Sequence, residues 1–355
     1  MRRLILLLCA LGALCLPVCA AELPEELDGA VPSELLDGAR KGDDLVARGA
    51  DYLRGMLGGA LEDAVLPALR AAAALMLLSL LCGLVEGTAA VAGEQGTSCV
   101  ALAGVLGAAA LSAGDLSALI GLGVETVDGL FTAAKLLVPT LAAAMAGGGC
   151  VSAASAWQVG ALAMCEIFLA LLRGCFVPAL YCMIGAAAAG ALLPESRLTL
   201  LSEGIGKLLS WALGALLFAF TGFLSLSGLL AGSADRAAVR LGKTVISGAV
   251  PVVGGILSDT AETLLAGADA LRGTIGTLGI FTVLALCMAP LLRLAAQYVL
   301  YRLTAFFCGM TGSEALRGFL EQLSSAFALM LAMTAGGAFV LLAALMIAIR
   351  MVMPV

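Results

Sequence analysis

Long apolar segments recur along most of this chain and are separated by short polar stretches. They are rich in Leu, Ala and Gly and do not alternate with polar residues as a half-buried strand would. A helix needs about 20 such residues to cross a bilayer, and shorter runs are compatible with re-entrant or tilted helices. The eight segments are residues 66–85, 99–114, 136–152, 159–172, 175–193, 208–231, 274–292 and 327–349. We therefore expect an all-α, polytopic membrane protein with about seven or eight transmembrane helices and additional amphipathic or re-entrant segments.

The N-terminus has the layout of a secretory signal sequence. A positively charged start precedes the apolar stretch 4–16, and Ala20-Ala21 offers a small-residue cleavage site. We expect residues 1–21 to be a signal peptide. The alternative is an uncleaved first membrane anchor.

The longest polar region of the chain, 22–63, comes next. Within it Leu53, Leu57 and Leu61 recur at helical spacing, which predicts an amphipathic helix lying on the membrane or against a partner. The alternative is a solvated lead-in to the first span. A transmembrane helical bundle is expected to follow over residues 64–232.

A basic stripe lies near the middle of the second half of the chain. Arg236, Arg240 and Lys243 fall on one face of a helix, whose other face is apolar. Such a helix can lie flat on anionic lipid, so we predict that this stripe faces the membrane surface.

The stripe leads into an apolar segment that is interrupted by proline and glycine at 249–257. After it, Asp259 followed by Glu262 is a favourable start for a new helix. We expect residues 233–273 to form two amphipathic helices joined by a broken turn, with C-terminal transmembrane helices in residues 274–355.

Ionisable residues inside apolar segments are costly in lipid and therefore informative. Lys135, Glu166 and Asp115 are of this kind, and Lys135 and Glu166 could pair across adjacent helices. One interpretation is a polar path or gate. The other is an ion pair that fixes helix register, with Lys135 and Arg173 extending towards the membrane surface.

Four prolines lie inside apolar segments, at Pro139, Pro178, Pro251 and Pro290. Each removes a backbone donor and can interrupt a helix, as transporters do at their midplane binding sites. Ordinary kinks are the alternative. Pairs of small residues four positions apart, such as Gly83 with Gly87, favour close helix packing within the chain or between copies in a homo-oligomer.

Composition supports the membrane interpretation and narrows the chemistry. Of 355 residues 62% are hydrophobic and 12% are charged, whereas a soluble domain has charge on about a quarter of its residues. The net charge of −6 gives no indication of a nucleic-acid partner. Histidine is absent and the 11 cysteines show no metal-type spacing, so we expect neither an enzyme nor a bound cofactor or metal.

Two stretches carry a family resemblance. Residues 137–141 run into 147–154, and the broken segment 247–259 is followed by Gly276 and Gly279. Together with the order of the parts, they resemble the stage III sporulation protein AE family of endospore-forming bacteria. The resemblance extends over most of the chain.

The resemblance implies a role in a sporulation assembly of the mother-cell membrane that surrounds the forespore. The family is thought to work beside other stage III sporulation membrane proteins, an ATPase and a forespore-side partner as a channel or secretion-like conduit. No catalytic residue is carried over. The matched positions are expected to be structural or gating: Pro139, Gly147, Gly148, Pro251, Gly254, Gly255 and Asp259.

Two other functions remain open from the residues. A small-solute permease could be built on the proline-interrupted helices and the Lys135 and Glu166 pair. Alternatively, the bundle only scaffolds rings that are made by other proteins. These hypotheses differ in partners, because a permease would act alone in a lipid bilayer.

Overall fold

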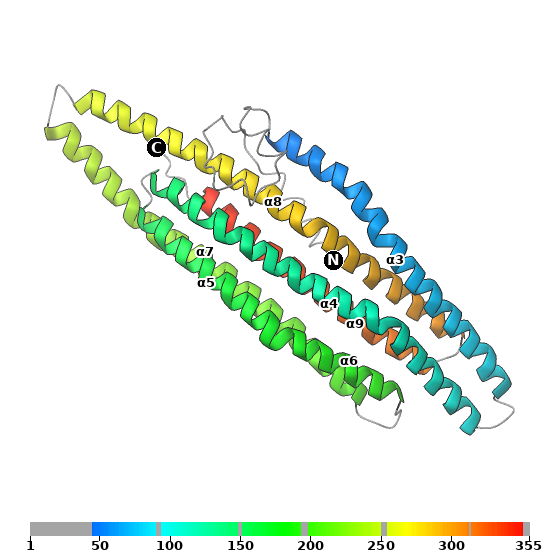
Figure 1. The fold of residues 1–355 in the computed structure, drawn as a ribbon. Helices are drawn as coiled ribbons and strands as arrows, with labels where there is room; N and C mark the ends of the chain where they lie inside the picture. Colours follow the sequence, from blue (N-terminus) through cyan, green and yellow to red (C-terminus); the bar gives the residue numbers. More distant parts are fainter. Residues whose placement is uncertain are drawn as a thin grey trace.

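The computed structural model describes residues 45–89, 94–147, 151–192, 198–249, 254–311 and 314–350, all of them helical. The helices run side by side along one long axis (Figure 1). Their bounds are α3 Leu45–Ala89, α4 Glu94–Gly147, α5 Val151–Leu171, the π-helical turn η3 Leu172–Phe176, α6 Val177–Leu192, α7 Leu198–Ala249, α8 Gly254–Thr311 and α9 Glu314–Arg350. Side chains of residues 227–272 lie outside the described part, as do residues 1–44.

Six helices in the described residues are long and apolar enough to cross a membrane. The prediction of an all-α, polytopic membrane protein is confirmed. The expected number of seven or eight spans is not confirmed, because in two cases a pair of predicted segments lies on one continuous helical run. Segment 99–114 and residues 136–147 share α4, while residues 159–172 and 175–192 lie on the continuous run α5–η3–α6.

Interruption of a helix at proline, the alternative to an ordinary kink, is not seen at Pro139 or Pro290. Helix α4 continues through Pro139, and α8 continues through Pro290. Each proline removes one backbone donor, and packing of the surrounding helices can outweigh that loss. Near Pro178 the chain instead widens into η3, where the Val177 N–H donates to the Leu172 carbonyl five residues earlier.

The segment 233–273 is helical on both sides of residues 250–253, but each helical part belongs to a longer helix. Its first part is the end of α7 and its second part is the start of α8, on either side of residues 250–253. Asp259 therefore lies inside α8 and does not cap it. Similarly, residues 45–63 of the predicted polar region continue directly into the apolar part of α3.

Helices α8 and α9 form the centre of the bundle. Of the apolar stretch of α9, 72% is buried, and of that of α8, 61%, whereas the other four candidate spans are between 22% and 28% buried. Two glycines of α8 allow the close approach of α9. A methyl group at Gly276 would overlap the Ile349 side chain, and one at Gly279 would lie 3.2 Å from Leu345 Cδ1.

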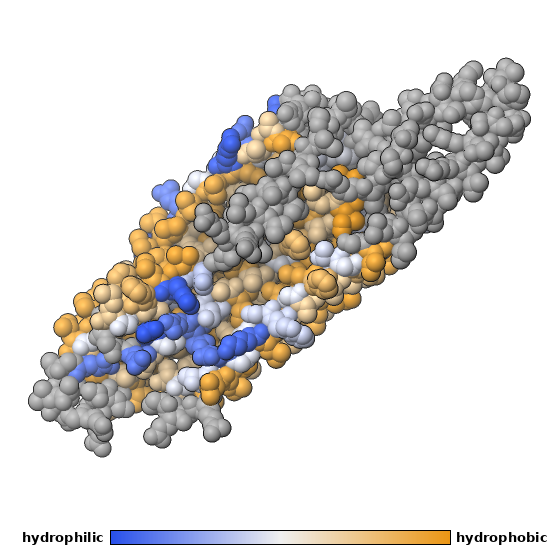
Figure 2. All heavy atoms as spheres, turned by 180° about the vertical axis from the view of Figure 1, so that it is seen from behind, coloured by the Kyte–Doolittle hydropathy of each residue, from blue (hydrophilic) through white to orange (hydrophobic). Residues whose placement is uncertain are grey.

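The outer helices pack around this centre and expose large apolar side chains. Phe218 of α7, for example, is 82% exposed. Trp157 of α5 points the other way, fully buried, and its indole Nε1 donates to the Ala344 carbonyl of α9 at 3.2 Å. An apolar exterior around a packed interior is what a lipid-embedded bundle requires. In Figure 2 most of the surface that is coloured by hydropathy is hydrophobic.

Candidate functional site

Two ion pairs join α4 to the α5–η3 helix. Lys135 Nζ lies 2.7 Å from Glu166 Oε1, and Arg173 Nη2 lies 3.1 Å from Asp128 Oδ1. On each helix the two charges are seven residues apart, which is about two turns and places them on one face. The structure thus brings the predicted pair together and adds a second pair at the same seam.

The seam between α4 and α5 lies at the surface of the bundle. The four side chains are between 49% and 57% exposed. Charges that face hydrocarbon are unfavourable even when paired, so this seam suits contact with water, headgroups or a polar partner better than contact with acyl chains. Whether it forms a path or a gate stays a prediction.

A polar cleft lies between α6, α7, α8 and α9. Its volume is about 480 Å³, and three of these helices contribute polar side chains to its lining. The charged and hydroxyl-bearing residues are Ser202, Glu203, Lys207, Ser210, Tyr298, Arg302, Glu321 and Ser325. Figure 2 shows hydrophilic side chains gathered in a band on an otherwise largely apolar face.

Local contacts hold the cleft side chains in place. Fully buried Ser202 donates to Gln322 Oε1 at 3.2 Å, which links α7 to α9. Lys207 donates to Glu203 Oε2 at 3.4 Å, one turn earlier on α7. These contacts connect the wall of the cleft to the central helix of the bundle.

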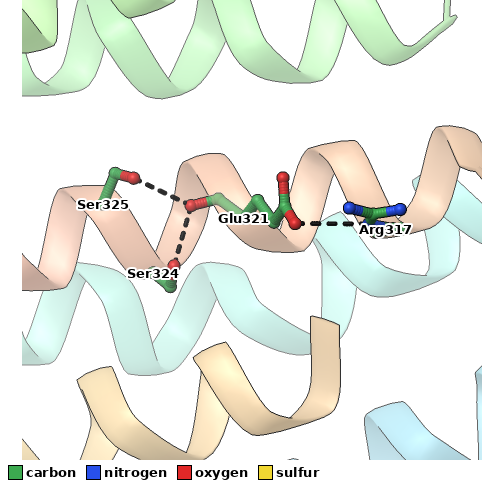
Figure 3. Close-up of polar contacts among 4 residues, drawn as sticks. All are labelled: Arg317, Glu321, Ser324 and Ser325. Carbon is green, nitrogen blue, oxygen red and sulfur yellow. Dashed lines mark hydrogen bonds and ion pairs between the residues drawn. The ribbon is translucent and has the colours of Figure 1, made fainter. Parts of the chain in front are cut away.

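Glu321 organises the α9 side of the cleft (Figure 3). Its carboxylate accepts a hydrogen bond from Arg317 Nε at 3.2 Å. Its backbone carbonyl accepts the hydroxyls of Ser324 at 2.8 Å and Ser325 at 2.9 Å, so both ends of the residue are engaged. An (i, i+4) pair of this kind fixes the side chain along the helix axis.

A smaller cavity adjoins the cleft. Its volume is about 410 Å³, and it shares Arg302 and Glu321 with the cleft. Its other lining residues are Phe306, Gly309, Met310 and Arg317. The two hollows therefore meet at Arg302 and Glu321.

A third cavity, between α3, α4 and α8, carries the predicted intramembrane carboxylate. Asp115 lines it together with Asp63, Glu125, Arg293 and Gln297, and its volume is about 510 Å³. The Gln297 Oε1 atom is buried and has no hydrogen-bond partner. No group of three or more potential metal ligands is found among the described residues, so this cavity has the polarity to hold water but not the arrangement of a metal centre.

Comparison with known proteins addresses the resemblance directly. The family model described as stage III sporulation protein AE matches residues 44–352. The chain belongs to this family. The predicted resemblance is thereby confirmed over most of the chain, and the six apolar helices make this family member a multi-pass membrane protein.

A relative in Bacillus subtilis (strain 168), named stage III sporulation protein AE, is 24% identical over 187 residues. The alignment covers 52% of this chain and 47% of the relative, so the chain spans about half of the length of the curated relative that it matches. No solved structure matches the chain.

Only some of the positions that carry the family resemblance lie in the described part of the chain. Pro139 lies within α4, and Gly147 is the last residue of that helix. Gly254 and Gly255 begin α8, on which Asp259 also lies, but the surroundings of these three residues are outside the described part. Gly148 and Pro251 fall outside the described residues altogether. A structural or gating role for these positions stays a prediction.

For the basic stripe, too, the structure describes the helix but not the side chains. Arg236, Arg240 and Lys243 all fall on helix α7. Their side chains lie outside the described part of the chain, so their contact with lipid stays a prediction.

The residues around Glu321 were missed by sequence reasoning. Their signal was present, because Arg317, Glu321 and Ser325 follow one another at four-residue intervals on one face of a helix that is largely apolar. On α7, Glu203 and Lys207 have the same spacing. The sequence did not indicate that these faces of α7 and α9 lie next to each other and next to Arg302 of α8.

Proposed function

We propose that this chain is a non-enzymatic membrane component of a channel or secretion-like complex that serves the developing spore. It sits in the mother-cell membrane around the forespore and is required for spore development. The observation that supports this most strongly is the family match over residues 44–352 on a chain with six apolar helices. The absence of histidine from the sequence excludes catalysis and metal binding that depend on an imidazole, which is in keeping with a non-enzymatic role.

The proposed partners are other stage III sporulation membrane proteins, a forespore-side protein and further copies of this chain. The half-exposed charges of the α4–α5 seam give a lipid-embedded protein a surface that a polar partner can cover. A tagged chain purified from cells at the engulfment stage is expected to bring such membrane proteins with it. Recovery of the chain alone under mild solubilisation would contradict this.

Deletion of the gene in its own spore-forming host tests the role itself. We expect vegetative growth to be unchanged and the yield of heat-resistant spores to collapse, with forespores that stop developing after engulfment. Expression of the intact chain in the mother cell should restore the yield, and expression only in the forespore should not. A normal spore yield in the deletion strain would refute the proposal.

A small-solute permease is the second candidate, favoured by the cleft of about 480 Å³ with polar walls. The two functions separate in liposomes that contain the purified chain alone. A permease would accumulate labelled solutes, whereas a subunit of a larger conduit would not. Uptake that Glu321→Gln or Arg302→Gln abolishes would favour the permease.

The role of the predicted pair can be resolved by exchanging its charges. Lys135→Glu alone places two carboxylates together and should impair sporulation. The double variant Lys135→Glu with Glu166→Lys restores the attraction across the seam. Recovery of spore yield in the double variant indicates that the pair fixes helix register, and a persistent defect indicates a path that needs each charge on its own helix.

A further inference from the structure

The smaller cavity lies where two candidate spans end. The candidate span Gly273–Met310 of α8 ends, and the candidate span Glu314–Ile349 of α9 begins, within a few residues of each other in the sequence. In Figure 1, α3, α6 and α8 end at this same end of the bundle, and α4, α7 and α9 begin there. Because a membrane protein presents the ends of its spans towards lipid headgroups, a cavity at this end of the bundle is well placed to meet them.

The cavity has an excess of positive charge. It is lined by two arginines and one carboxylate, Arg302, Arg317 and Glu321. Glu321 is engaged by Arg317 at 3.2 Å, while Arg302 has no hydrogen bond or ion pair within the described part of the chain. Among the described residues, the Arg302 guanidinium is therefore not paired with a carboxylate.

The backbone of α8 makes room for the second guanidinium. A Cβ atom at Gly309 would lie only 3.0 Å from Arg317 Cδ, so the Arg317 side chain crosses α8 where a glycine leaves space. Its Nε is bound to Glu321, which leaves the terminal nitrogens as donors. Arg302 lies on the same face of α8 as Gly309, about two turns earlier.

The outer wall of the cavity is apolar and exposed. Phe306 is 65% exposed and Met310 is 73% exposed, and both line the cavity beside the arginines. A ligand that fits has a negative head next to a hydrocarbon body. Guanidinium groups are well suited to phosphate oxygens, and basic pockets between helices at headgroup level are typical of anionic lipid sites.

We propose that the α8–α9 cavity binds the phosphate of an anionic phospholipid, held by Arg302 and Arg317, with an acyl chain along Phe306 and Met310. This site is independent of the function proposed above. It would tie the central hairpin of the bundle to a membrane leaflet that contains anionic lipid.

Lipid retention by the purified full-length chain tests the site. The chain is placed in nanodiscs of phosphatidylcholine with a minor share of phosphatidylglycerol, and retained lipids are counted by native mass spectrometry after release. We expect phosphatidylglycerol to be retained preferentially, and Arg302→Gln and Arg317→Gln each to lower that retention by about fivefold. Equal retention in the wild type and both variants would overturn the proposal.

Arg293→Gln is the matched control, because Arg293 lies on the same helix but lines the cavity with three carboxylates. It should leave phosphatidylglycerol retention unchanged. Glu321→Gln keeps an acceptor for Arg317 and removes the opposing charge, so it should raise retention. That variant keeps the test decisive if an arginine variant folds poorly, since unchanged or lower retention would again count against the site.

Soluble glycerol phosphate distinguishes the two sources of a phosphate group. If the site is a lipid site, an excess of glycerol phosphate should not displace phosphatidylglycerol, because the acyl contacts with Phe306 and Met310 are missing. Displacement through Arg302 would instead identify a site for a soluble phosphate ligand and would overturn the lipid assignment.

Discussion

The central hairpin of α8 and α9 and the helices that surround it have similar apolar compositions but opposite surroundings. Most of the apolar stretch of α9 is buried, whereas less than a third of that of α3, α4 or α7 is. In water such outer helices would need a polar face, and here Phe218 and Trp211 are exposed instead. The difference shows that close packing, rather than hydrophobicity, distinguishes inside from outside in this protein.

The largest difference in stability is expected between substitutions of the two tryptophans. Trp157→Ala removes a fully buried indole and its bond to the Ala344 carbonyl, so the free energy of unfolding should fall by about 3–5 kcal/mol. Trp211→Ala, at a site that is 71% exposed, should change it by less than about 0.5 kcal/mol. Unfolding in mixed detergent micelles measures the stability of both variants. Equal losses of unfolding free energy would contradict the placement of Trp157 inside the bundle and Trp211 on its surface.

A smaller effect is expected from added methyl groups. Gly276→Ala would press against Ile349 between α8 and α9 and should destabilise the chain by about 1–3 kcal/mol. Gly214→Ala, on the outer helix α7, meets no atom within 4 Å and should stabilise it by about 0.5–1 kcal/mol through helix propensity. Changes of the same sign at both sites would be inconsistent with the packing described.

The smallest effect concerns a single contact between the two layers. Ser202→Ala leaves Gln322 Oε1 without its donor from α7, which should lower the free energy of unfolding by about 0.5–1.5 kcal/mol. Ser210→Ala is the control, because the exposed Ser210 hydroxyl bonds only to the Gly206 carbonyl of its own helix. An equal loss in both variants would indicate that the Ser202 contact adds nothing.

Sequence patterns predicted the class of fold because apolar runs of this length are rare outside transmembrane helices. They did not predict that segment 99–114 and residues 136–147 share helix α4, since the residues between them include Asp115, Glu125 and Asp128 and the packing that accommodates these charges is tertiary. Helices that are apolar on all sides also hide which face turns inward. The burial of Trp157 and the exposure of Trp211 could not be predicted from their neighbours in the sequence.

The candidate sites were predictable to different degrees. Lys135 and Glu166 stood out as isolated charges in apolar runs, and their proximity needed only two adjacent helices. Asp128 and Arg173 each lie about two helical turns from a member of the first pair. Once the two helices are known to be neighbours, this second ion pair is therefore expected. The cleft could not be found this way, because Ser202, Arg302 and Glu321 come from three distant parts of the chain.

The most direct test of the account asks whether lipid surrounds the outer helices and is excluded from the centre. The chain has two tryptophans, so Trp157→Phe leaves only Trp211 and Trp211→Phe leaves only Trp157 as the fluorescent reporter. In bilayers of brominated phospholipid, we predict strong quenching of Trp211 and little quenching of Trp157. Equal quenching of the two, or quenching of Trp157 alone, would contradict the claim that lipid is the solvent of the outer surface.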